Sequence, residues 1–185
     1  MMRISQWLQS YSTGPVALAA LLVFVTFSVL VLPRQTRSQG SEAGTPDLSL
    51  FYSKGDLYRW AEAYGEQGRR DYVRARFTFD VVWPLVYTFF LVTTIGWLCA
   101  RAFAPGSRWQ LANLAPVLGM LFDFLENIAT SLVIGRYPQP TPVLDSLAGI
   151  FTLLKWGFIA ASFLLLVVAL GVAVGTFAWR RVVRK

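Results

Sequence analysis

Residues 119–129 read GMLFDFLENIA, and this stretch decides the fold class because it places two carboxylates and a carboxamide inside an apolar run. The run extends over residues 111–134, which is long enough to cross a bilayer, since a span needs about 20 apolar residues. Asp123, Glu126 and Asn127 are spaced three and four apart, so on a helix they share a face. An ionised group at the bilayer centre costs about 3 kcal/mol. We therefore predict a transmembrane helix whose polar stripe faces other helices or a wet cavity.

The composition of the whole chain is that of a membrane protein. Its 185 residues are 55% hydrophobic and 15% charged, with a mean hydropathy of +0.50. Four segments are apolar enough to span a bilayer, and they lie at about 15–32, 79–100, 111–134 and 147–179. Helices satisfy their own backbone groups in lipid. The sequence thus predicts an all-α integral membrane protein, a four-transmembrane-helix bundle forming a single membrane domain over residues 1–185.

The first extramembrane loop, residues 33–78, contains a further predicted helix. Ser53 and Asp56 have the spacing of a capping box. The apolar residues that follow at helical spacing are Leu57, Trp60, Ala61 and Tyr64. We predict a short amphipathic helix that lies on the membrane or on the bundle, with a solvated loop helix as the alternative. From Arg69 onward no breaker precedes the second span, which predicts one continuous helix.

Basic residues predict the orientation. With four spans, the N-terminus, the 101–110 connection and the C-terminal tail share one side of the membrane. The Lys and Arg residues on this side are Arg3, Arg101, Arg108, Arg180, Arg181, Arg184 and Lys185. Cytoplasmic loops carry an excess of such residues, although the long first loop is basic too. We therefore expect both termini in the cytoplasm.

Several function classes are excluded by what the chain lacks. It has no histidine, which removes histidine-ligated haem and every triad with an imidazole base. Its one cysteine, Cys99, allows no intrachain disulfide or four-cysteine zinc site. The net charge of +7 comes with no nucleic-acid-binding motif, so we expect no nucleic acid partner. No cofactor is evident, and the one metal hypothesis left open is a divalent cation on Asp80, Asp123 and Glu126.

Lys155 is the only basic residue inside a predicted span. If the turn between the third and fourth spans centres near Pro140, Lys155 lies level with Glu126. Lys155 is therefore the predicted partner of Glu126 or Asp123. An alternative is that the long fourth segment projects from the membrane and Lys155 snorkels to the interface.

The second span contributes a second set of polar groups. Asp80, Pro84 and Tyr87 share one helix face, and Pro84 frees the backbone carbonyl of Asp80. The turn near residues 104 and 105 places Tyr87 level with Asp123. Polar groups from three helices are thus expected to converge, with Arg69 and its basic neighbours just above them.

We predict a polar intramembrane site in which Asp123 and Glu126 are the candidate catalytic residues. The residues predicted to bind substrate beside them are Asn127, Lys155, Tyr87, Asp80, Arg69 and Arg70. Such a site would bind a polar or amphiphilic small molecule or a lipid, and carboxylate-based enzyme chemistry is one use of it. The sequence leaves open whether the protein is an enzyme.

Two alternative functions remain. In the first alternative, the protein is a non-enzymatic subunit or assembly factor whose acids join helices. In the second, it is an oligomer that conducts protons or ions. Gly171 and Gly175 form a GxxxG motif, which allows close contact with a second copy or a larger membrane complex. Membrane lipids are the other expected partners.

No characterised family is identified. The run GRRDYVRARFTFDVVWPLVY, followed by DFLEN, resembles a signature of small bacterial membrane proteins, and this resemblance implies no particular activity. The resemblance implies a bacterial plasma membrane, and no residue role is carried over from it.

Overall fold

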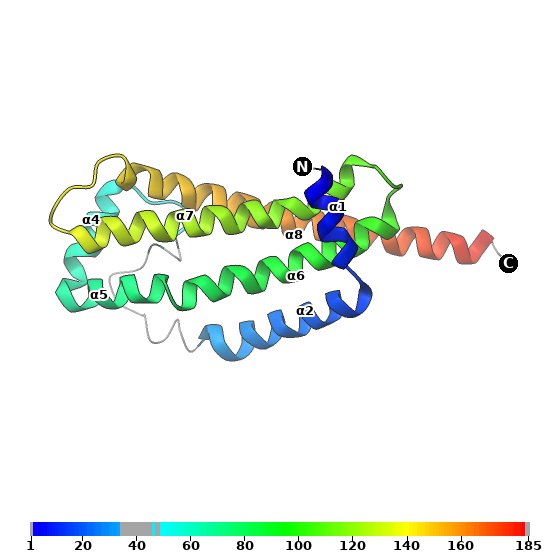
Figure 1. Cartoon of the computed structure of the whole chain (residues 1–185), viewed down its shortest axis with the longest axis horizontal. Coiled ribbons are helices and arrows are strands. Elements are labelled where there is room, and N and C mark those ends of the chain that lie inside the picture. Colours follow the sequence, from blue (N-terminus) through cyan, green and yellow to red (C-terminus); the bar gives the residue numbers. More distant parts are fainter. Residues whose placement is uncertain (1, 34–45, 47–48, 184–185) are drawn as a thin grey trace. The chain divides into compact units, whose positions relative to one another are not determined.

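The computed structural model describes residues 2–33, 46 and 49–183, with the side chains of residues 180–183 left out. The described residues contain helices and no strand (Figure 1). The elements are α1 (Met2–Tyr11), α2 (Gly14–Thr26), the π-helical η1 (Phe27–Val31), α4 (Lys54–Ala63), α5 (Gly65–Arg76), α6 (Phe79–Ala102), the 3₁₀-helical η3 (Arg108–Leu114), α7 (Ala115–Arg136) and α8 (Leu144–Val183).

Four helical stretches are long and apolar enough to cross a membrane. They are Gly14–Val31, Gly65–Ala102, Arg108–Arg136 and Leu144–Trp179. The predicted all-α, four-span architecture is therefore confirmed. Arg184 and Lys185, which contributed to the orientation argument, lie outside the described residues, and the cytoplasmic placement of the termini stays a prediction.

The chain divides into two compact units, each of which takes part of α6, α7 and α8. The first unit comprises Met1–Thr26, Val86–Leu118 and Phe158–Lys185, and the second comprises Phe27–Leu85 and Gly119–Gly157. The single membrane domain over residues 1–185 stays a prediction.

In the first unit, α1 is joined to η3 by buried polar contacts. Ser5 Oγ donates to Asn113 Oδ1 at 2.8 Å, and Asn113 Nδ2 donates back to the Ser5 carbonyl at 3.1 Å. A methyl group on Gly96 of α6 would lie 2.6 Å from Ser12 Oγ, so only glycine allows this close approach. The sequence analysis did not predict α1, because its ten residues are too short and too polar to read as a span.

The core of the second unit is built around α4. Ser53 and Asp56 form the predicted capping box, and the buried residues Leu57 and Ala61 lie on the predicted apolar face. The buried core residues are Tyr52, Leu57, Ala61, Tyr72, Ala129, Val133, Ile134 and Ala148. The amphipathic loop helix is thus confirmed, and it packs onto helices α5, α7 and α8 of its own unit.

The helix predicted to run continuously from Arg69 into the second span is interrupted at Phe77 and Thr78. α5 ends at Arg76 and α6 begins at Phe79. Thr78 Oγ1 donates to the Arg74 carbonyl at 2.9 Å. A threonine hydroxyl that bonds back to the preceding turn competes with the helical backbone pattern and bends the helix.

Candidate functional site

A buried lysine connects α7 and α8 in the second unit. Lys155 Nζ lies 2.5 Å from Glu126 Oε2 and 4.0 Å from Asp123 Oδ1. All three side chains are buried, and Glu126 is only 1% exposed. The pairing predicted from helix depth is therefore present, and Lys155 does not snorkel away from the carboxylates.

α7 carries the acids on its inward face because of their spacing. Asp123, Glu126 and Asn127 are buried, whereas Leu121 and Ile128 on the same helix are exposed. Three and four residues separate side chains on one helix face, so the polar stripe turns away from the apolar surface. This arrangement avoids the cost of presenting ionised groups to lipid.

Tyr52 closes the other side of Glu126. Its hydroxyl donates to Glu126 Oε1 at 3.1 Å. Burial, followed by the negative charge of Glu126, raises the pKa of Tyr52 well above its usual value of 10.0, so the hydroxyl stays protonated and able to donate. The Tyr52 carbonyl lies where a side chain at Gly149 of α8 would be. Because Gly149 has no side chain, the backbone at Tyr52 can approach α8 closely. Sequence analysis missed Tyr52, because it precedes the capping box in an irregular segment.

A second set of contacts joins α5, α6 and α7. Arg76 Nη1 lies 2.9 Å from Asp80 Oδ2, and Asn127 Nδ2 donates to the Asp80 backbone carbonyl at 3.1 Å. This is the carbonyl that Pro84, which has no N–H, leaves without its helical donor. Arg76 is buried and its guanidinium lies over the Tyr72 ring at 4.3 Å. Arg76 is one of the basic neighbours of Arg69 that were expected just above the polar groups, and it is buried beside Asp80.

We call these residues together the buried charge cluster. Its members are Tyr52, Arg76, Asp80, Asp123, Glu126, Asn127 and Lys155. Three carboxylates lie in it with two cationic side chains, so the fully ionised cluster carries a net charge of −1. Uncompensated charge is costly in a low-dielectric setting, so the excess negative charge favours either a further cation or protonation of one carboxylate.

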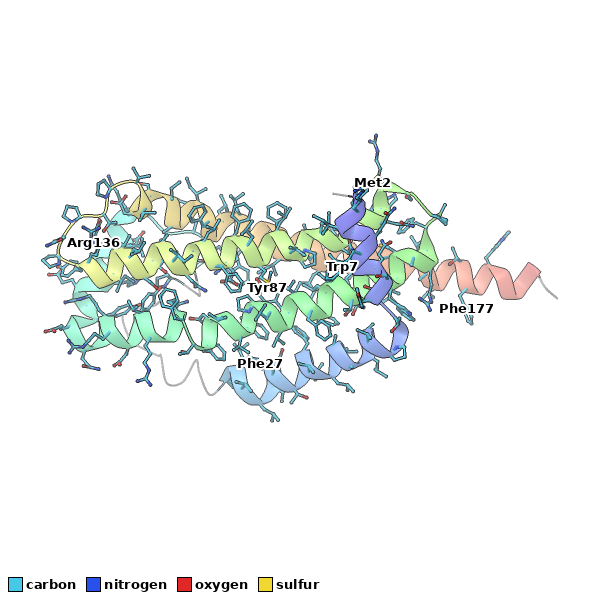
Figure 2. All side chains as sticks on the ribbon, viewed as in Figure 1. Met2, Trp7, Phe27, Tyr87, Arg136 and Phe177 are labelled. Atoms are coloured by element: carbon cyan, nitrogen blue, oxygen red, sulfur yellow. The ribbon has the colours of Figure 1, made fainter. Side chains whose placement is uncertain are left out.

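Three further residues were predicted to belong to the site, namely Tyr87, Arg69 and Arg70. Tyr87 is buried in the first unit on α6 (labelled in Figure 2), and its role in orienting a ligand stays a prediction. Arg69 and Arg70 line a groove of about 670 Å³ in the second unit, none of whose lining residues belongs to the buried charge cluster.

The geometry of the carboxylates bears on the metal hypothesis. Among the residues that the structure describes, no group of three Cys, Asp or Glu side chains is placed to hold a metal ion. The Lys155 ammonium lies beside Glu126 and Asp123, in the position that a cation bridging them would take. A divalent cation on Asp80, Asp123 and Glu126 stays a hypothesis without a formed site.

The GxxxG motif lies in the first unit on α8. Within the described part of the chain, nothing comes within 4 Å of a Cβ placed at Gly171 or Gly175. The face is open, and association with a second copy through it stays a prediction.

The fold is that of a helical membrane protein, and the second unit contains a buried charge cluster. Comparison with family profiles, curated proteins and solved structures finds no match. Function is therefore inferred from the chemistry of the cluster.

Proposed function

We propose that the protein binds the ammonium group in the headgroup of an amphiphilic molecule at the buried charge cluster. The observation that carries the proposal is the excess of one carboxylate over the cationic side chains. A ligand ammonium supplies the missing charge, and its alkyl chains remain in the apolar phase beside the helices. Amine-bearing membrane lipids have this chemistry.

Asp123 is the residue proposed to meet the ligand. Glu126 is enclosed by Lys155 at 2.5 Å and Tyr52 at 3.1 Å, and Asp123 lies 4.0 Å from the same lysine. The Asp123 side chain is also the more accessible of the two acids, at 11% against 2% exposed. Because its side chain is the more accessible, Asp123 is the acid that an approaching ligand meets first, and any general acid or base chemistry on the ligand would begin with it.

A structural role is the second candidate, and one observation favours it. Lys155 with Glu126 and Arg76 with Asp80 are internal ion pairs between different elements, as expected of residues that join helices. Under this role Asp123→Asn and Glu126→Gln lower the amount of folded protein in the membrane. Under the binding role, Asp123→Asn leaves that amount unchanged. The proposed setting for both roles is a bacterial plasma membrane with cytoplasmic termini.

The experiment is a lipid-retention measurement. The protein is placed in nanodiscs of equal parts phosphatidylethanolamine, phosphatidylglycerol and phosphatidylcholine, and lipids that stay bound after release are counted by native mass spectrometry. We expect phosphatidylethanolamine above its bulk share on the wild type and at its bulk share on Asp123→Asn. The matched control is Asp71→Asn, an exposed carboxylate on α5.

Two results would overturn the binding proposal. One is equal phosphatidylethanolamine on wild type and Asp123→Asn. The other is no enrichment on the wild type, in which case a proton, rather than an amphiphile, balances the charge of the cluster.

A further inference from the structure

A basic groove lies on the second unit where α7 ends, near Arg136 (labelled in Figure 2). Its volume is about 670 Å³. The polar and aromatic lining residues are Glu66, Arg69, Arg70, Arg74 and Tyr137. Three guanidinium groups with one carboxylate give the groove a net charge of +2.

The helices α5 and α7 lie close together beside the groove, at Gly135 and Val73. A Cβ at Gly135 of α7 would lie 3.6 Å from Val73 Cγ2 of α5. Arg70 and Arg74 are four residues apart and share a face of α5, and Arg69 directly precedes Arg70. All three arginines line the groove. The backbone thus gathers the positive charge on one wall.

The three arginines differ in how firmly they are held. Arg69 Nη1 donates to the Ala61 carbonyl at 3.0 Å, and its guanidinium lies 5.1 Å from the centre of the Tyr137 ring. Arg70 is exposed and pairs with Glu66 at 2.5 Å. An exposed pair within one helix contributes only about 0.3–0.5 kcal/mol, so a stronger anion displaces Glu66 readily. Arg74 is exposed as well.

The position of the groove along the chain indicates its surroundings. The membrane-spanning stretch Arg108–Arg136 ends directly before Tyr137, which lines the groove. Tyrosine and arginine are enriched where a span leaves the hydrocarbon, at the level of lipid headgroups. A guanidinium binds phosphate oxygens in a bidentate geometry, and several guanidiniums together favour a phosphate over a carboxylate within the same helix.

We propose that this groove binds the phosphate of an anionic membrane lipid. Arg70 and Arg74 take the phosphate oxygens, and Arg69, fixed by Ala61 and Tyr137, supplies a preorganised positive charge. The site is separate from the buried charge cluster and takes a ligand of opposite charge, so it does not depend on the function proposed for Asp123.

The test uses nanodiscs of phosphatidylglycerol and phosphatidylcholine in equal parts, with retained lipids counted by native mass spectrometry. We expect phosphatidylglycerol to be enriched on the wild type, and the double variant Arg70→Gln/Arg74→Gln to lower that enrichment about tenfold, since each lost guanidinium removes a charge-assisted contact. The matched control is Arg3→Gln/Arg59→Gln, which makes the same change in net charge at exposed positions away from the groove.

Further arms separate the alternatives. One arm adds inorganic phosphate, which competes for the groove if its ligand is the free ion. If the groove holds a lipid, phosphatidylglycerol should stay bound. Asp123→Asn should leave phosphatidylglycerol retention unchanged. Helix content by circular dichroism verifies that the double variant is folded. The proposal fails if that folded variant retains phosphatidylglycerol as the wild type does, if the control variant loses it equally, or if inorganic phosphate removes it.

Discussion

Asn127 Nδ2 donates to the backbone carbonyl of Asp80 at 3.1 Å, and Pro84 is the reason that this carbonyl is available. A side chain of α7 therefore replaces a backbone donor that α6 lacks. A proline inside a membrane helix is tolerated when a neighbouring helix satisfies the freed group in this way. The contact fixes the position of Asp80, whose carboxylate pairs with Arg76.

The first prediction tests this substitution of donors. Asn127→Leu should lower the free energy of unfolding by about 1–3 kcal/mol, because the buried Asp80 carbonyl loses its donor. Pro84→Ala restores a backbone N–H, so the double variant should recover part of that loss. Thermal unfolding of the four proteins in detergent forms a double-mutant cycle. Strictly additive effects would show that Asn127 does not stand in for the missing N–H.

The second prediction concerns the charge balance. Lys155→Met should destabilise the protein by about 3–5 kcal/mol, because it leaves Glu126 buried without its cation. The double variant Lys155→Met/Glu126→Gln should be more stable than Lys155→Met alone. Asp123→Asn should have little effect or be stabilising, since it removes the excess charge. Chemical denaturation in mixed micelles measures the free energy of unfolding of the three variants. A large loss of stability in Asp123→Asn would contradict the excess of one negative charge in the cluster.

A third prediction rests on the close approach of Tyr52 to α8. Gly149→Ala places a methyl group on the Tyr52 carbonyl and should cost about 1–3 kcal/mol through overpacking. Gly157 lies on the same helix with nothing within 4 Å of its Cβ position, so Gly157→Ala is the matched control. We expect the control to be neutral or stabilising. Similar melting temperatures for the two variants would remove the steric account.

The fourth prediction is a pH dependence at the start of α4. Hydrogen bonds from the Ser53 side chain and backbone lower the pKa of Asp56 below its usual 3.8. A carboxyl group whose pKa is lower in the folded state stabilises the fold at any pH above its unfolded-state pKa. This stabilisation is lost as the pH falls through the lower pKa of the folded state. Ser53→Ala should therefore cost about 1 kcal/mol at pH 7 and less at pH about 2–3. Urea titrations at the two pH values measure the difference, and an equal cost at both would contradict the capping-box account.

The spans could be predicted from the length of their apolar runs, and the loop helix from the spacing of its capping box. The pairing of Lys155 could be predicted from its depth in the helix relative to the short turn before it. Tyr52 could not, because only a tertiary contact brings this irregular segment to Glu126. Arg76 was expected near the polar groups, and its pairing with Asp80 is a local contact between residues four apart. The break at Thr78 was missed for a related reason, since its hydroxyl competes with a backbone that propensity favours. The roles assigned to Asp123, Glu126 and Tyr87 stay predictions.

The Lys155–Glu126 pair also has a consequence for how the protein enters the bilayer. α7 alone would bring two carboxylates into hydrocarbon, and the first part of α8 alone would bring an ammonium. The connection between them is only residues 137–143. Inserting the two helices as a hairpin lets the opposite charges neutralise each other during entry. Because the charges on the two helices are opposite, we expect the third and fourth spans to leave the insertion machinery together.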